Sequence, residues 1–161
     1  MRETAVLAPE YARRAEQVMQ KHPDVAWIRD MGIRIGFLRS DREKKSHGRP
    51  VLGECIKVND LQKALIPYDF LIVIYEVNTE YLVEWQIDVL IYHELLHVGI
   101  NNKGDTYVIR PHDLQEFEAI ARRYGIDWAD PDRENAAEGV QGETKGENPT
   151  EETTAAGISE E

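Results

Sequence analysis

Two histidines lie four residues apart in the segment YHELLHVGI (residues 92–100), and a glutamate directly follows the first of them. On a helix this spacing corresponds to about 400° of rotation, so His93 and His97 project from one face, one turn apart. Two imidazoles placed in this way can bind one zinc ion. Glu94 lies close enough to act on a water at the metal without being a ligand itself. This HExxH pattern predicts a zinc site with Glu94 as the general base.

The residues around the motif are almost all apolar, which predicts a buried helix. Histidines and a carboxylate in such surroundings are strongly destabilising unless they have partners, and a metal ion would be one. The alternative interpretation is that His93 bonds to a backbone carbonyl and that Glu94 is an exposed helix charge. The apolar neighbours are Ile87, Val89, Leu90, Ile91, Leu95, Leu96 and Val98.

A catalytic zinc usually has three protein ligands and one position left for water. His112 is the only histidine after the motif, and the intervening turn at residues 101–105 allows the chain to reverse. We therefore predict His112 as the third ligand. Glu116 and Asp113 are alternatives, because Glu116 would lie one helical turn from His112. Asp113 could instead orient a ligand imidazole or stabilise the start of a helix.

Tyr107 lies between the motif and His112 and carries a hydroxyl that could donate a hydrogen bond to an oxyanion. A packing role is the more common one for such a tyrosine. The sequence thus predicts a possible substrate contact for Tyr107 and leaves the packing alternative open.

The elements that must position these residues follow from hydrophobic periodicity. Helical spacing predicts a helix over Pro9–Lys21 that ends at His22 and Pro23. Alternation predicts a strand around Ile33–Phe37, with Val51–Val58 as its partner. The later elements are a strand buried on both faces at Asp69–Tyr75, the motif helix from an N-cap at Asn78 or Thr79 to about Val98 with Gly99 as its stop, an extended segment at Thr106–Ile109, and a closing helix from about His112 to Tyr124.

Charge and composition divide the 161 residues into two parts. The net charge is −11, and residues 130–161 contain ten acidic and two basic residues, so residues 1–129 are nearly neutral. The last 32 residues hold too few large apolar side chains to offset the entropy of ordering. We predict one folded domain over residues 1–129 and a disordered acidic tail over residues 130–161.

The same composition bounds the setting of the protein. A single cysteine, Cys55, fits a reducing compartment, so the cytoplasm is expected. No run approaches the roughly 18 apolar residues that a membrane span needs, so no membrane association is expected. His22 and His47 lack a local partner pattern and are expected to be exposed.

A basic loop lies at residues 39–49, between the two predicted strands. Arg42, Lys44, Lys45 and Arg49 outnumber the acids there, which is ordinary for a solvated hairpin loop. Contact with nucleic acid phosphates is a second, weaker possibility, since no aromatic residues are interleaved for base stacking.

The segment YHELLHV, followed by KGDTYVIRPHDLQEFEAIARRYGIDW, resembles the phage metallopeptidase family, itself similar to the SprT-like, minimal zincin proteases. The likeness covers most of residues 10–128 and is strongest from Tyr92 to Trp128. It implies that His93, His97 and His112 bind zinc and that Glu94 is catalytic.

Together these observations predict a zincin-like α+β domain with a small mixed or antiparallel sheet, an N-terminal helix, the motif helix and a closing helix. The predicted activity is hydrolysis of a polypeptide by a zinc-activated water. The resemblance implies a phage origin, with the host cytoplasm as the setting. The alternative is a non-catalytic, zinc-stabilised protein that binds a host protein or DNA.

Overall fold

The most apolar segment of the chain forms the centre of the main sheet. In the computed structural model, which describes residues 4–113 and 116–131, β6 (Phe70–Tyr75) pairs in parallel with β2 (Ile35–Ser40) and antiparallel with β5 (Gly53–Lys57). The first strand, β1 (Ala5–Leu7), adds antiparallel to β2, which gives the order β1-β2-β6-β5. A strand rich in β-branched and aromatic residues suits the central position, since both of its edges are paired there.

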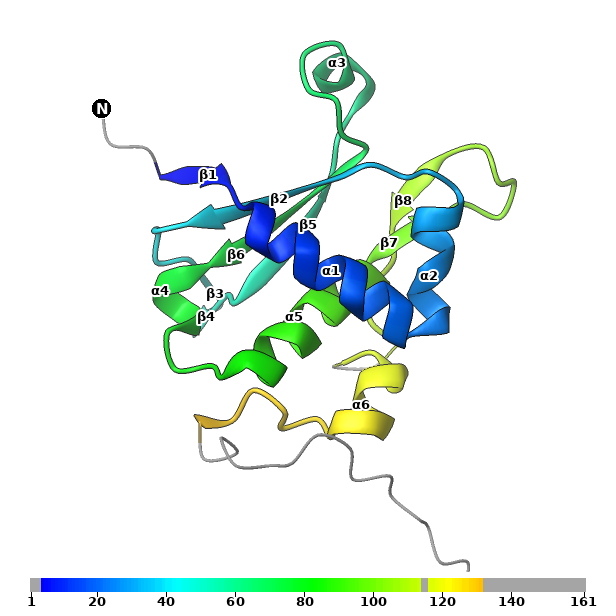
Figure 1. Ribbon diagram of the computed structural model, residues 1–161. Helices are drawn as coiled ribbons and strands as arrows, with labels where there is room; N and C mark the ends of the chain where they lie inside the picture. Colours follow the sequence, from blue (N-terminus) through cyan, green and yellow to red (C-terminus); the bar gives the residue numbers. More distant parts are fainter. Residues whose placement is uncertain (1–3, 114–115, 132–161) are drawn as a thin grey trace, which may run out of the picture.

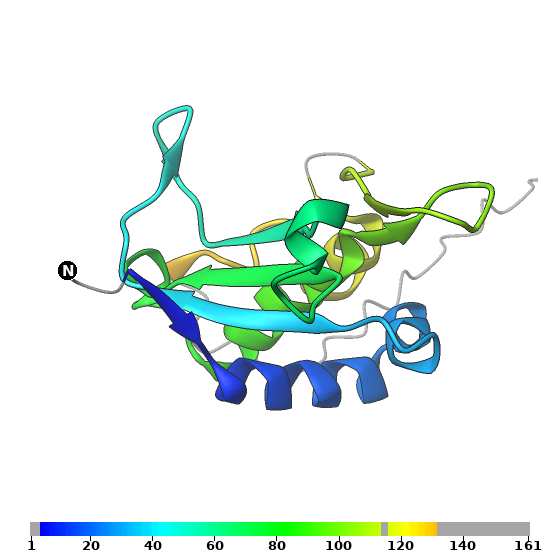
Figure 2. The ribbon, with the colours of Figure 1, turned by 90° about the horizontal axis from the view of Figure 1, so that it is seen from above.

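Two long helices cover one face of this sheet. Helix α1 (Pro9–Lys21) packs against β2 and against α5 (Glu84–Leu96), and α5 packs against β5. Figure 2 shows α1 running beneath the sheet, on the side opposite α3 and the β3-β4 hairpin. Ile72 and Ile74 of β6 are fully buried toward these helices, together with Ala15 of α1 and Leu95 of α5. The architecture is therefore mixed α+β, as predicted.

Shorter elements surround this core. They are α2 (Pro23–Asp30), α3 (Asp60–Lys63), α4 (Glu76–Thr79) and α6 (Glu118–Tyr124), the hairpin of β3 (Lys45–Ser46) with β4 (Arg49–Pro50), and the hairpin of β7 (Val98–Ile100) with β8 (Tyr107–Ile109). Figure 1 shows the β7-β8 hairpin at the C-terminal end of α5, with α6 below it.

The predicted helix at Pro9–Lys21 and the buried strand at Phe70–Tyr75 are confirmed. The predicted pairing of the strands that flank the basic loop is wrong. β6 lies between β2 and β5, and the loop itself contains the small hairpin β3-β4. β6 is the most apolar of the strands, so it takes the central position between β2 and β5, which the prediction had placed side by side.

The boundaries of the motif helix also differ from the prediction. Residues Glu76–Thr79 form the separate helix α4, because the Asn78 amide donates to the carbonyls of Lys44 and Val51 and does not cap α5. Helix α5 starts at Glu84. The N–H of Val83, the residue before it, donates to the side-chain oxygen of Gln86 at 2.9 Å. It ends at Leu96.

Gly99 lies in strand β7 and is not a helix stop. A Cβ at Gly99 would lie 3.2 Å from Val108 Cγ2 and 3.3 Å from the Val108 carbonyl oxygen. Glycine therefore permits the close approach of β8 to β7, directly after the segment that contains His93 and His97.

The predicted closing helix is shorter than expected. It begins at Glu118, so His112 lies outside it, and it ends before Gly125, whose φ of 82° suits glycine. Residues 114 and 115 of the predicted closing helix, and all but the first two residues of the predicted tail, 130–161, lie outside the described residues.

His22 was expected at the surface and is buried, with 3% of its surface exposed, whereas His47 is exposed as predicted. The His22 ring stacks on Tyr92 at a centroid distance of 3.9 Å. Among the described residues, no helix has the length and apolar character that a bilayer span requires.

Candidate metal centre and active site

Helix α5 carries the first two histidines at its C-terminal end. His93 lies in the last turn, and His97 follows the helix with φ −73° and ψ −20°, which is still helical, so the four-residue spacing keeps both rings on one side. Their ring centroids are 5.1 Å apart. The helix is held in place because Leu90 and Leu95 are buried in the core.

The β7-β8 hairpin returns the chain to these histidines. The N–H of Arg110 donates to the carbonyl of His97 at 2.7 Å, and the Arg110 carbonyl lies 2.6 Å from His97 Nδ1. A carbonyl can only accept, so His97 carries its proton on Nδ1 and leaves Nε2 free. His112 follows two residues after Arg110, and this double contact therefore determines where His112 lies.

The three imidazoles converge on one point. The ring of His112 lies 4.8 Å from that of His93 and 4.7 Å from that of His97, measured between centroids. The Nε2 atoms of His93 and His112 are 3.0 Å apart, and one nitrogen from each of the three residues lies within 4.8 Å of the others. In a tetrahedral zinc site, ligand nitrogens are about 3.3 Å apart, given Zn–N bonds of about 2.0–2.1 Å. The three donors therefore fit a single cation.

A largely buried carboxylate, that of Glu116, contacts the first histidine at Nδ1. Glu116 Oε1 lies 2.6 Å from His93 Nδ1, an ion-pair contact that lacks the angle of a well-formed hydrogen bond. The indole N–H of Trp128 donates to Glu116 Oε2 at 2.9 Å, and the N–H of Phe117 donates to Oε1 at 2.7 Å. Metal-binding histidines commonly present their second nitrogen to such a carboxylate or carbonyl. The environment of both His93 and His97 directs Nε2 toward the common point.

The Phe117 ring forms one wall of the cluster. It is fully buried, and its centroid lies 5.3 Å from that of His93, 4.8 Å from that of His97 and 5.1 Å from that of His112. An apolar ring in contact with all three imidazoles limits the access of water to one side of the cluster.

Burial affects the three histidines differently. Burial lowers the pKa of His97 to about 4, although its bond to the Arg110 carbonyl opposes the shift. Burial also lowers the pKa of His112, and the nearby His93 adds to this. Burial acts in the same direction on His93, but the contacts with Glu116 and Glu94 outweigh it and raise its pKa. Neutral His97 and His112 keep the lone pair that a metal requires.

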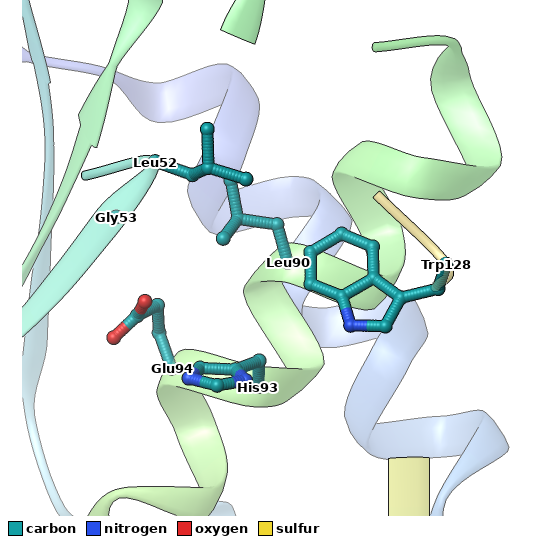
Figure 3. A pocket seen from close by; sticks show the side chains of 6 residues that line it. All are labelled: Leu52, Gly53, Leu90, His93, Glu94 and Trp128. Atoms are coloured by element: carbon teal, nitrogen blue, oxygen red, sulfur yellow. The ribbon is translucent and has the colours of Figure 1, made fainter. Parts of the chain in front are cut away.

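Glu94 is buried beside this cluster, with 3% of its surface exposed. Burial raises its pKa to about 7, an effect that His93 opposes and that the neighbouring Glu54 and Glu116 increase. The carboxylate points toward the start of β5, where a Cβ at Gly53 would lie 2.9 Å from Oε1 (Figure 3). A carboxylate with a pKa near 7 is well suited to accept and return a proton.

Comparison with known families agrees with this geometry. A family model described as "Putative phage metallopeptidase" matches residues 4–136. The chain belongs to this family. No curated protein and no solved structure matches the chain. Membership in the phage metallopeptidase family indicates a metal-dependent peptidase with a polypeptide substrate, and the cluster of His93, His97 and His112 is a group that could hold the metal ion.

Within this phage metallopeptidase, the predicted alternatives to His112 have other contacts. Asp113 Oδ2 accepts from the N–H of Glu118 at 3.3 Å, at the start of α6, and its Oδ1 lies 3.8 Å from an Arg110 nitrogen. Glu116 contacts His93 from behind and is outside the group of three donors. Neither shares a helix with His112, in contrast to the spacing argument made from the sequence.

The described ring contacts of Tyr107 are with residues other than the three histidines. Its ring packs against Phe70 at a centroid distance of 5.6 Å and lies under Lys63 Nζ at 5.0 Å. The packing alternative accounts for these contacts, and a role in binding an oxyanion stays a prediction.

Several residues of the site were not singled out by sequence reasoning. Leu52, Gly53, Leu90 and Trp128 line a pocket together with His93 and Glu94 (Figure 3). The indole N–H of a buried tryptophan needs a partner, so Trp128 was the one of these residues that the sequence could have indicated. The partner, Glu116, could not be assigned without the fold.

The two lysines of the basic loop pair with acids of the same chain. Lys44 pairs with Glu54, and Lys45 Nζ lies 2.9 Å from Glu43 Oε1. Nothing in the described residues or in the family supports the predicted contact with nucleic acid.

Proposed function

We propose that this protein is a zinc-dependent peptidase of the HExxH type with a zincin-like active site. His93, His97 and His112 would hold the ion. The observation that carries the proposal is the convergence of three imidazole nitrogens next to the buried carboxylate of Glu94. A zinc ion bound there supplies Lewis acidity, which activates water and polarises a carbonyl oxygen.

Glu94 performs the proton transfers in this proposal. Its carboxylate accepts a proton from the attacking water and then delivers that proton to the amine of the departing peptide. The raised pKa of Glu94 supports both steps, because the group can hold the proton for the interval between them. Gly53 and the N–H of Cys55 keep the carboxylate at the start of β5.

The edge of β5 that pairs with no other strand offers a place for an extended substrate, at the end away from β8, which packs against β5. The backbones of Leu52 and Val58 bond to β6, so by alternation the backbone groups of Gly53, Cys55 and Lys57 face away from it. β5 is the last strand in the sheet order. A polypeptide that pairs with the remaining backbone groups of this edge runs past Glu94, which already accepts the N–H of Cys55.

The set of donors argues against the alternative of a zinc-stabilised binding protein. Structural zinc sites usually have four protein ligands, whereas the cluster in the described residues has three. We assign residues 1–129 to the peptidase domain and keep residues 130–161 as a separate acidic tail, in line with the composition of the sequence.

The decisive experiment pairs metal analysis with one substitution. Glu94→Gln should retain about one zinc per chain and lose hydrolysis of an unstructured protein substrate by at least about a hundredfold, because a general base contributes about 10²–10⁴-fold. Glu84→Gln, on the exposed start of the same helix, is the matched control and should change neither quantity. Full turnover by the Glu94 variant, or retention of zinc after joint replacement of His93 and His97 by alanine, would exclude the proposal.

A further inference from the structure

A pocket of about 170 Å³ lies next to the proposed catalytic residues. Its walls come from three parts of the chain: the start of β5, the middle of α5 and the segment after α6. Figure 3 shows the side chains of Leu52, Leu90 and Trp128 on one side of the space and those of His93 and Glu94 on the other.

The volume suits one side chain of moderate size. Pockets for whole small molecules usually measure about 300–1,000 Å³. A cavity of about 150 Å³ lined by apolar residues holds a benzene molecule. The pocket therefore has room for a group of the size of a leucine or phenylalanine side chain and is too small for a complete cofactor.

The walls favour an apolar occupant. Leu52 and Leu90 are aliphatic, and the indole N–H of Trp128 is already used by Glu116. The Trp128 carbonyl accepts from the buried Gln86 amide at 2.9 Å, which fixes the backbone behind the ring. A charged side chain would lose its hydration in this pocket. Apart from His93 and Glu94, the side chains that line the pocket offer it no free hydrogen-bonding group.

The position of the pocket links it to a substrate on the edge of β5. Gly53, Cys55 and Lys57 share the face of the sheet that is turned toward α5, because Gly53 pairs with Ile74 and Cys55 with Ile72. Gly53 has no side chain, so the Glu94 carboxylate can lie against the strand at this point, and both residues line the pocket. An incoming strand alternates its side chains, so one of them points toward α5 near the reacting bond.

We propose that this pocket is the specificity site of the enzyme and receives one apolar side chain of the polypeptide substrate, at a position next to the cleaved bond. The inference rests on the proposed peptidase function. Leu52, Leu90 and Trp128 are then the residues that determine which side chain is preferred.

The test measures binding separately from turnover. Zinc-loaded protein carrying Glu94→Gln is titrated calorimetrically with blocked glycine pentapeptides whose central residue is leucine, phenylalanine or aspartate. The leucine and phenylalanine peptides should bind at least about tenfold more tightly than the aspartate peptide, as one or two buried methylene groups already account for such a ratio. In parallel, the wild-type protein is given a peptide library, and the residues flanking each cut are identified.

Leu52→Trp should fill the pocket and remove the preference for leucine and phenylalanine. Leu52→Ala should enlarge it and shift the preference toward phenylalanine. Leu61→Trp is the matched control on the exposed helix α3, where 83% of the leucine is accessible, and should leave all ratios unchanged.

Equal or undetectable binding of the apolar and acidic peptides, or ratios that ignore both Leu52 variants, would overturn the pocket assignment even if the enzyme cleaves peptides. If the apolar peptides bind in a Leu52-dependent way but the wild-type protein cleaves nothing, the pocket assignment stands and the peptidase proposal fails.

Discussion

Replacing Glu116 by glutamine should weaken zinc binding without removing a ligand. The carboxylate lies 2.6 Å from His93 Nδ1 and accepts the indole N–H of Trp128 at 2.9 Å. Glutamine keeps the shape of the side chain but removes its charge. It also offers one acceptor oxygen where Glu116 uses two, so the contacts at one of the two oxygens are lost. The orientation of His93 is then held less firmly.

The size of the effect follows from the burial of this contact. The Glu116 side chain is 12% exposed and that of His93 is 14% exposed, so water screens the interaction little. Loss of a carboxylate that supports a metal-binding histidine is expected to cost about 1.4–2.8 kcal/mol of metal-binding free energy. With about 1.4 kcal/mol for each factor of ten, the zinc affinity should fall about 10- to 100-fold, which is the usual effect of losing such a supporting partner.

The assay is a competition for zinc between the protein and a chromogenic chelator at pH 7.5. Glu118→Gln provides the control, since its side chain is 56% exposed and pairs with Arg122 on the surface of α6. It should change the affinity less than about twofold. An unchanged affinity for Glu116→Gln would refute the argument that this carboxylate holds His93. Complete loss of zinc from that variant, with zinc retained by His112→Ala, would identify Glu116 as the third ligand in place of His112.

Two further predictions concern stability. Burial, with the nearby Arg123, lowers the pKa of His22 from 6.5 to about 4. As the pH falls, the unfolded chain therefore binds a proton at His22 before the folded protein does. The contribution of neutral His22 to the stability of the folded protein is complete above about pH 6.5 and is lost between pH 6.5 and pH 4. The free energy of unfolding of the metal-free protein, measured with urea, should therefore be lower at pH 5.0 than at pH 7.5 by about 2 kcal/mol from this group. This difference should be absent in His22→Asn and present in the exposed control His47→Asn. Parallel pH profiles for all three proteins would contradict the prediction. Truncation after Pro131 should leave the melting temperature within about 2 °C, whereas truncation after Tyr124 should lower it by at least about 4 °C because it removes Trp128 and its bonds to Gln86 and Glu116. Equal melting temperatures for the two truncations would show that the segment after α6 does not support the fold.

The sequence predicted best those elements whose own side chains determine them. The apolar positions of α1 and the continuous apolar run of β6 each carry their full signal locally, and both elements have the predicted bounds to within a residue. The spacing of His93 and His97 is likewise a local property. Each of these features depends on the helix or strand period alone.

Features that depend on distant contacts could not be predicted. The alternation in β2 and β5 shows which face is buried but not which strand lies alongside, and β6 separates them. The start of α6 was placed too early because the segment from His112 to Glu116 bonds to other parts of the chain, with Glu116 turned toward His93 and Trp128. The burial of His22 has the same origin, since its stacking partner Tyr92 lies seventy residues away in the chain.

The charges of the site explain why a divalent cation fits it better than a protein partner would. Glu94 and Glu116 both lie within the buried region around His93, and no lysine or arginine among the described residues pairs with either carboxylate. Two anionic groups in such surroundings need compensation, and the three imidazoles facing them cannot all be protonated, because burial lowers the pKa of His97 and His112. A 2+ ion held by the three imidazoles would balance this negative charge, and it would require neutral imidazoles, which burial favours at His97 and His112.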